Sequence, residues 1–191
     1  MEENSREAII AKYTDKSRYK PEYIFGDVYV DEERIAETLK SKDEKEIFEK
    51  EFDIAKRFSE RYAVEVFMLP QMGGNKIIYL EKHSNPDIIT NGIFADIKCP
   101  SGSEVSIKKR FQESVHQADG VIISIDKSIS ILKIKKWIED KLRWMDNHDG
   151  FKVAIEVGKK NKITEIFEIK GKGLEKAPLS GCRGFRPRSI K

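Results

Sequence analysis

Two acids and a lysine have the types and spacing that a divalent metal ion and a phosphodiester require. Asp87 follows a proline, Asp96 stands nine residues further on, and Lys98 comes two residues later. Hard ions such as Mg²⁺ and Mn²⁺ prefer carboxylate and carbonyl oxygens, so we expect Asp87 and Asp96, with the carbonyl of Ile97, to bind one of them. Such a metal polarises a phosphate and lowers the pKa of its bound water. Lys98 would orient that water or stabilise the charge that builds up at phosphorus.

The elements around these residues must bring them together. If residues 93–98 form a strand, Asp96 and Lys98 point to the same face, because side chains alternate along a strand. Asn91-Gly92 is a strong signal for a two-residue turn between strands. Such a turn would fold the chain back and bring Asp87 beside Asp96.

Two further polar residues are candidates for the same site. Glu51 lies on a predicted helix over Glu46–Tyr62, whose apolar residues recur at helical spacing. A third acid from this helix would complete a metal site or hold a metal-bound water, although other acids on the helix simply face solvent. Gln117 stands near the end of a second predicted helix, Glu104–Asp119, and would support the site from there.

Basic residues gather in two clusters near helix starts and in the last stretch of the chain. The clusters are Lys108, Lys109, Arg110, Lys133, Lys135 and Lys136. Both would suit a phosphate backbone, and both also fit a solvated helix face. Residues 170–191 carry seven Lys or Arg against the single acid Glu175, which indicates a polyanion partner or a solubilising tail.

Several other kinds of site find no support. The three histidines are far apart and show no ligand spacing, and neither His116 nor His148 has an evident acid or base partner in the sequence. Cys99 and Cys182 are too few for a disulfide framework or a cysteine zinc site. Gly73-Gly74-Asn75 is not a phosphate loop, because no Gly-Lys-Ser/Thr follows it.

Length and composition suit one globular core. The chain has 191 residues, of which 39% are hydrophobic and 36% charged, and its net charge is +3. No apolar run approaches the roughly 18–20 residues of a membrane span, and the charged N-terminus is unlike a secretory signal. We therefore expect no membrane span and, for the sequence as given, a cytoplasmic location.

The predicted elements alternate in a way that indicates an α/β fold with a mixed central sheet flanked by helices. We expect a polar, partly irregular segment over residues 1–45, a folded domain over 46–170 and a basic tail over 171–191. A strand over Val121–Ile125 is almost wholly apolar, as in a strand buried on both faces. The other predicted elements are a helix over Asp31–Leu39, strands over Val64–Leu69, Lys76–Leu80 and Ile93–Cys99, a helix over Ile134–Met145, and strands over Phe151–Val157 and Ile163–Ile169.

Pro86-Asp87 followed by Asp96-Ile97-Lys98 resembles the PD-(D/E)XK nuclease superfamily. The likeness runs over about Glu46–Ile125 and extends to the restriction-endonuclease-like core of helix, three strands, helix and strand. More narrowly, the segments Glu51–Ala55, Val64–Pro70 and His116–Asp119 are similar to the nuclease domains of contact-dependent growth inhibition and related polymorphic toxins. Asp96 stands where many members have glutamate.

This resemblance implies a metal-dependent endonuclease, in the toxin branch often one that cuts tRNA. It makes Glu51 the helix acid, Asp87 and Asp96 metal ligands, and Lys98 the catalytic lysine, with Mg²⁺ or Mn²⁺ as cofactor. A toxin would act in the cytoplasm of a target cell and would have a cognate immunity or inhibitor protein. Two alternatives stay open: a DNA endonuclease of the same fold from a mobile element or phage, and an inactive nucleic-acid-binding or assembly module.

Overall fold

The computed structural model describes residues 5–70, 86–158 and 163–177. These residues form five α-helices and nine strands, and the strands pair both in parallel and antiparallel. The expected α/β class with mixed pairing is therefore confirmed. The chain divides into two compact units whose boundary falls between Phe94 and Ala95, here called the N-terminal and C-terminal units. The boundaries expected at residues 45 and 170 stay predictions.

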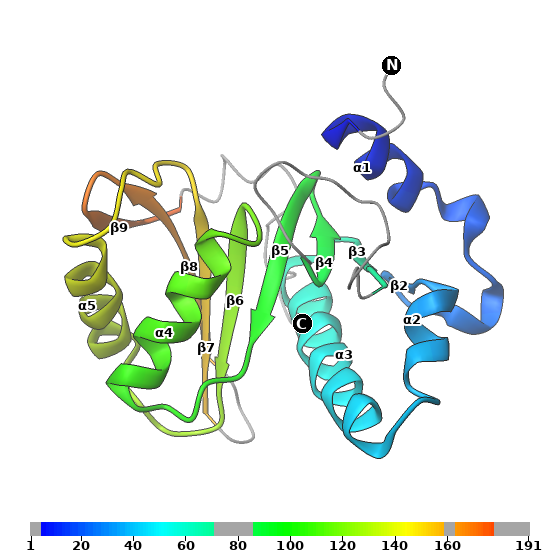
Figure 1. The fold of residues 1–191 in the computed structure, drawn as a ribbon, viewed down its shortest axis with the longest axis horizontal. Helices are drawn as coiled ribbons and strands as arrows, with labels where there is room; N and C mark the ends of the chain where they lie inside the picture. Colours follow the sequence, from blue (N-terminus) through cyan, green and yellow to red (C-terminus); the bar gives the residue numbers. More distant parts are fainter. Residues whose placement is uncertain (1–4, 71–85, 159–162, 178–191) are drawn as a thin grey trace, which may run out of the picture. The chain divides into compact units, whose positions relative to one another are not determined.

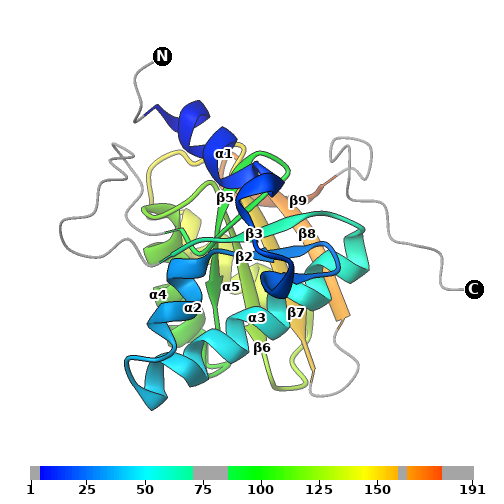
Figure 2. The same cartoon turned by 90° about the vertical axis from the view of Figure 1, so that its right-hand side faces the viewer.

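The N-terminal unit combines three α-helices with four strands. Strand β1 pairs antiparallel with β2, β2 parallel with β3, and β3 antiparallel with β4. Helix α3 packs against β2 and β3 (Figures 1 and 2). The elements are α1 (Arg6–Thr14), two 3₁₀ turns (Lys16–Arg18 and Pro21–Tyr23), β1 (Ile24–Phe25), β2 (Val28–Val30), α2 (Glu32–Glu37), α3 (Lys42–Tyr62), β3 (Val66–Met68) and β4 (Ile88–Thr90).

Helix α3 is the longest element of the N-terminal unit, and its sequence explains both ends. Ser41 caps its start, since the Ser41 hydroxyl accepts a hydrogen bond from the backbone N–H of Glu44 at 3.1 Å. Ile54 and Phe58 lie on its buried stripe. The helix ends at Ala63, which takes the left-handed conformation with φ 51°. The predicted helix is confirmed and begins four residues earlier than expected.

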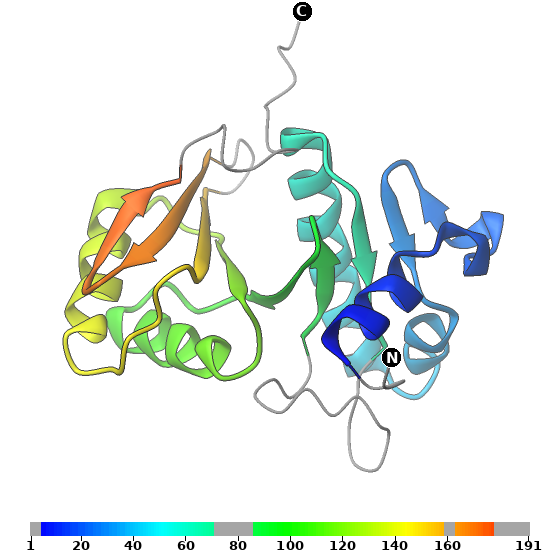
Figure 3. The same cartoon turned by 90° about the horizontal axis from the view of Figure 1, so that it is seen from above.

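The C-terminal unit is built from strands that run next to one another in chain order from β5 to β9. Strands β5, β6 and β7 are parallel, whereas β8 and β9 add antiparallel edges. Helices α4 and α5 lie side by side on one face of these strands (Figures 1 and 3). The elements are β5 (Ile93–Lys98), α4 (Glu104–Val115), β6 (Gly120–Ile125), α5 (Ile131–Leu142), β7 (Lys152–Val157), β8 (Ile163–Lys170) and β9 (Gly173–Lys176).

The register of β5 decides which way its charged residues point. Asp96 pairs with Val121 and Lys98 with Ile123, and both partners belong to the hydrophobic core beneath α4 and α5. Residues paired in a parallel sheet share a face. Asp96 and Lys98 therefore point to the helix-covered face of the C-terminal unit, and the predicted strand places them together as expected.

Several segments differ from the sequence prediction. Within residues 1–45, which were expected to be polar and partly irregular, α1 forms, capped by Ser5, with Ile9 and Tyr13 buried one turn apart. Helix α4 ends at Val115 rather than at Asp119, and α5 spans Ile131–Leu142 rather than Ile134–Met145. Beyond Gly171, where periodicity fades, β9 still pairs with β8, because backbone pairing does not require an alternating side-chain pattern. The strand predicted over residues 76–80 lies outside the described residues. Among the described helices, none combines the length and apolar character needed to cross a membrane.

Candidate active site

Asp96, Lys98 and Ser114 form a hydrogen-bonded group in the C-terminal unit, here called the Asp96 cluster. Asp96 is fully buried, at 0% exposure. Its Oδ1 accepts a hydrogen bond from Lys98 Nζ at 2.7 Å, and its Oδ2 accepts one from Ser114 Oγ at 2.8 Å. The Lys98 side chain keeps 18% of its surface exposed. The cluster thus joins a buried carboxylate to a cation that solvent still reaches.

Ser114 was not found from the sequence, and α4 explains its place. It lies on the last turn of α4, on the same buried stripe as Phe111 and Val115. Its hydroxyl also lies 2.9 Å from the backbone carbonyl of Arg110, but its single proton can be donated to only one acceptor at a time. Beside an ionised Asp96 the charged acceptor is preferred. A polar residue in an apolar stripe was the available signal.

Gln117 follows one turn after Ser114, and its backbone N–H donates to the Ser114 carbonyl at 2.9 Å. Its side-chain Oε1 is buried and has no hydrogen-bond partner among the residues that the structure describes. Buried polar atoms are nearly always paired, so an orphaned acceptor at this position is notable. The expected supporting role of Gln117 stays a prediction.

Asp87 belongs to the N-terminal unit. It is half-buried, immediately precedes β4, and its backbone carbonyl accepts a hydrogen bond from the Leu69 N–H at 2.9 Å. The predicted turn is confirmed, since Asn91 and Gly92 have φ of 50° and 72°, the signs that a type I′ turn needs at both central residues. Because Asp87 and Asp96 lie in different units, their approach stays a prediction from the sequence.

Glu51 lies in the N-terminal unit, where it forms an ion pair with Arg34. Arg34 also pairs with Glu37 at 2.9 Å, and only 3% of the Arg34 side chain is exposed. These three residues are called the Arg34 cluster. Burial opposes the charge on Arg34, but Glu51 and Glu37 outweigh it and raise the pKa of the guanidinium.

A metal role for Glu51 stays a prediction. Within the described ranges, no group of three or more His, Cys, Asp or Glu residues is placed to hold a metal ion. The carboxylate of Glu51 already has a cation as its neighbour in the Arg34 cluster. Sequence patterns did not indicate this pairing, because Arg34 and Glu51 are 17 residues apart and lie on different helices.

Most of the predicted phosphate-binding cations have partners within their own helix. Lys108 pairs with Glu104 at 2.5 Å, Arg110 with Glu113 at 2.9 Å and Lys135 with Glu139 at 3.6 Å. Lys133 lies over the ring of Trp137, whereas Lys109 and Lys136 are exposed. These contacts are typical of a solvated helix face, and the predicted contact with nucleic acid stays a prediction.

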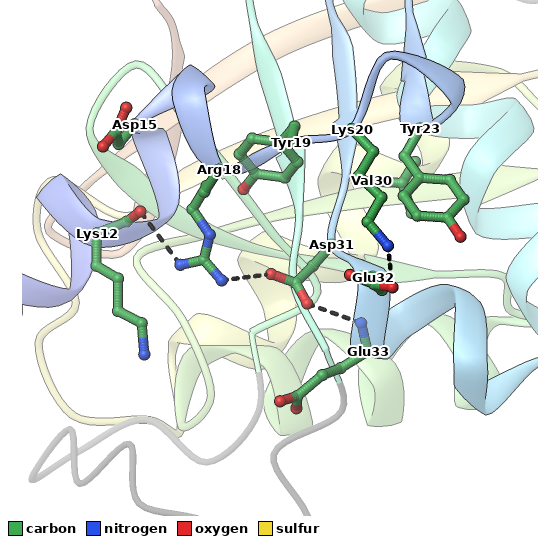
Figure 4. A pocket seen from close by; sticks show the side chains of 10 residues that line it. All are labelled: Lys12, Asp15, Arg18, Tyr19, Lys20, Tyr23, Val30, Asp31, Glu32 and Glu33. Atoms are coloured by element: carbon green, nitrogen blue, oxygen red, sulfur yellow. Dashed lines mark hydrogen bonds and ion pairs between the residues drawn. The ribbon is translucent and has the colours of Figure 1, made fainter.

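The N-terminal unit contains a cavity of about 520 Å³ between α1, the 3₁₀ turns and the start of α2 (Figure 4). Arg18 pairs with buried Asp31 at 2.9 Å, and Lys20 pairs with Glu32 at 2.5 Å. Asp31 also caps α2 by accepting from the Glu33 N–H at 2.9 Å. The cavity is lined by three basic and four acidic side chains, so it offers no excess of positive charge to a phosphate.

Two of the histidines lie close together in the structure. His116 and His148 show no ligand spacing in the sequence, yet their ring centroids lie 6.4 Å apart in an edge-to-face arrangement. Burial, followed by the charge of His116, lowers the pKa of His148. Their proximity comes from the parallel pairing of β6 and β7, since each histidine stands four residues before the start of one of these strands.

No protein-family model, curated protein or solved structure matches this chain. Its function is therefore argued from its own residues.

Proposed function

We propose that the protein is a divalent-metal-dependent endonuclease that hydrolyses phosphodiester bonds in RNA, with tRNA as the expected substrate. The observation that carries the proposal is the Asp96 cluster, in which a buried carboxylate pairs with a partly exposed lysine near the end of a strand. Burying a charge is costly, and here the cation that balances the buried carboxylate is one that solvent can reach. The restriction-endonuclease-like core is part of the same proposal.

The donor atoms of the proposed site fit Mg²⁺ or Mn²⁺, because they are carboxylate oxygens. Asp96 would hold the ion together with Asp87, which the sequence assigns to the site, and Glu51 is the third candidate ligand. When bound, the ion polarises the scissile phosphate and acidifies a water.

The residues of the chain do the rest of the work. Ser114 fixes Oδ2 of Asp96, so the other carboxylate oxygen keeps a defined direction. Lys98 holds its ammonium 2.7 Å from that oxygen, where it would stabilise the negative charge that develops on the phosphate during attack. Gln117 follows the C-terminal end of α4, and its side-chain Oε1 is a buried acceptor without a partner among the described residues.

The choice of RNA rests on the likeness of Glu51–Ala55, Val64–Pro70 and His116–Asp119 to toxin nuclease domains. On that reading the protein acts in the cytoplasm of a target cell, and a cognate inhibitor would cover the site with acids of its own. A DNA endonuclease would use the same residues, since a fold does not fix the substrate. An inactive binding module is the remaining alternative.

The test is cleavage of purified tRNA and of supercoiled plasmid, each with Mg²⁺ and with EDTA. We expect tRNA to be cut only with Mg²⁺ and the plasmid to stay intact. Asp96→Asn and Lys98→Met are expected to lower the rate by at least about 100-fold, the scale for removing one charge-stabilising group. Asp140→Asn, on α5 outside the cluster, is the matched control, and circular dichroism checks folding.

Each outcome decides between the readings. Plasmid cleavage that depends on Asp96 would make the protein a DNA endonuclease. Binding of intact tRNA without cleavage would favour the inactive module. Full activity in both Asp96→Asn and Lys98→Met would end the proposal.

A further inference from the structure

Three segments that are distant in the sequence meet beside His148 in the C-terminal unit. The end of α4 supplies His116, whose ring lies 6.4 Å from that of His148 in the loop between α5 and β7. The β8–β9 turn supplies Lys172, whose ammonium donates to the backbone carbonyl of Met145 in the same loop. Two imidazoles and an ammonium therefore gather on one surface.

This loop is tied down by backbone hydrogen bonds. The Gly150 N–H donates to the Ile169 carbonyl at 3.0 Å, and the Gly171 N–H donates to the Asp149 carboxylate at 2.5 Å. The Phe151 N–H donates to the His148 carbonyl at 3.1 Å. The loop is thus a fixed platform, held against β8 and the β8–β9 turn.

Trp144 begins this loop with its side chain 88% exposed, the largest exposure among the exposed large hydrophobic side chains of the described residues. Its backbone N–H donates to the Lys141 carbonyl at 3.1 Å, so its main chain is fixed while the indole stands in solvent. Trp137, by contrast, packs against the hydrophobic core. An indole offers a flat apolar face together with an N–H donor, and such side chains are enriched where proteins bind ligands and partners.

The charged groups that face His148, close in the chain to Trp144, include His116, Asp146 and Lys172. Lys172 brings an ammonium group to this surface. Asp149 already accepts hydrogen bonds from the Asn147 amide and the Gly171 N–H. Protonation of His148 therefore adds positive charge to this surface as the pH falls.

The same end of α4 also carries the Asp96 cluster. Ser114, which donates to Asp96, is two residues before His116. At the rise of 1.5 Å per residue in a helix, this separation is only a few ångströms along the chain. The backbone at His116 is therefore close along the chain to the helix turn that holds Asp96, although the exposed His116 and the buried Ser114 point to different sides of that turn.

We propose that Trp144, His116, His148 and Lys172 form a binding surface for a single-stranded segment of RNA. The indole of Trp144 stacks on a base, and the three cationic groups contact phosphates. The choice of RNA rests on the proposed function, whereas the binding surface itself does not. Aromatic stacking combined with basic side chains is how single strands are held without sequence preference.

The histidines make the binding depend on pH in a stated direction. His148 faces His116, Asp146 and Lys172, and its pKa is lowered by burial first and then by His116. It is therefore neutral above pH 7 and gains a proton as the pH falls. Binding is expected to tighten from pH 7 to pH 5.

The experiment measures fluorescence anisotropy of a fluorescein-labelled oligouridylate in EDTA, where metal-dependent cleavage does not occur. Trp144→Ala is expected to weaken binding about 5- to 100-fold, the range for losing one stacked base, and Trp144→Phe to keep most of it. Leu132→Ala is the matched control, because Leu132 is also an exposed hydrophobic residue of this unit, at 74%. The double variant His116→Gln/His148→Gln is expected to lose the pH dependence.

Equal affinity of wild type and Trp144→Ala would overturn the proposal. The proposal would also be overturned if the oligouridylate, annealed to oligoadenylate, bound as tightly as the single strand and lost as much affinity in Trp144→Ala. If the wild-type protein cleaves neither tRNA nor plasmid but still binds through Trp144, the proposed function fails and the binding surface stands. If the wild-type protein cleaves tRNA and Trp144→Ala binds the oligouridylate as tightly as wild type, the proposed function stands and the binding surface fails.

Discussion

The Arg34 cluster and the Asp96 cluster are both buried groups of charge, but they differ in balance and access. In the Arg34 cluster one buried cation faces two carboxylates, those of Glu37 and Glu51. In the Asp96 cluster one buried carboxylate faces one ammonium and one hydroxyl, and the ammonium is partly exposed. In the Arg34 cluster two carboxylates surround a buried cation, whereas in the Asp96 cluster the cation is partly exposed to solvent.

This difference shows that burial of an acid does not by itself mark an active site. A carboxylate whose charge is matched inside the protein stabilises the fold. A carboxylate whose partner reaches solvent can exchange that partner for a ligand. We therefore place the proposed chemistry at the Asp96 cluster and treat Glu51 as the candidate ligand that most needs testing.

The largest effect on stability is expected in the Arg34 cluster. Glu51→Gln leaves buried Arg34 with Glu37 alone, and breaking a buried ion pair typically costs about 3–5 kcal/mol. We expect a loss of about 3 kcal/mol, at the lower end of that range, because Glu37 remains. Urea denaturation gives the free energy of unfolding.

A second residue of α3 provides the control for Glu51. Glu46 lies 3.9 Å from Lys42 in an exposed pair, so Glu46→Gln should change stability by less than about 0.5 kcal/mol. If Glu51→Gln leaves stability unchanged but abolishes tRNA cleavage, Glu51 acts as a metal ligand rather than as the partner of Arg34. The Arg34 cluster would then not be purely structural, and the distinction between the two clusters would be wrong.

A smaller effect is expected at Ser114. Ser114→Ala leaves Oδ2 of buried Asp96 without its donor, and a hydrogen bond to a charged group contributes about 1.5–3 kcal/mol. We expect a loss of stability in that range together with a weaker apparent affinity for Mg²⁺ in the cleavage assay, because the carboxylate is no longer held in one orientation. Both are read from urea denaturation and from cleavage rates at increasing Mg²⁺.

Gln112→Ala is the control for Ser114→Ala, because Gln112 is an exposed residue of the same helix. Alanine is the best helix former, so no stability should be lost there. A Ser114→Ala variant that unfolds like wild type and needs no more Mg²⁺ would show that Ser114 does not position Asp96.

Local patterns predicted much of the fold. The apolar stripes of α3, α4 and α5 and the apolar run of β6 gave the main elements, because each pattern has the period of its structure. Ser103 has a residue type common at helix starts and caps α4, where its hydroxyl accepts a hydrogen bond from the Ser106 N–H at 3.2 Å. Alternation along β5 was enough to place Asp96 and Lys98 on one face.

The periodicity of the sequence could not predict the contacts between distant residues on which the proposed function depends. Ser114 is 18 residues from Asp96, and only the crossover from β5 through α4 brings them together. The pairing of Arg34 with Glu51, and that of His116 with His148, likewise depend on how elements pack. A single sequence shows which residues carry chemistry, but not which distant partner neutralises or orients them.

The smallest expected effect concerns pH and separates His148 of the C-terminal unit from the Arg34 cluster. The pKa of His148 is lowered in the folded state, so the unfolded state binds more protons as the pH falls below the ordinary histidine value. The contribution of His148 to stability is thus complete above about pH 6.5 and is lost as the pH falls through the folded pKa. Arg34 stays charged throughout this range and adds no such dependence.

We expect the wild-type melting temperature to fall slightly from pH 7 to pH 5. His148→Gln is expected to flatten this slope. Glu51→Gln is expected to be less stable but to keep the slope. A slope of the same size in His148→Gln would assign the pH dependence to other groups.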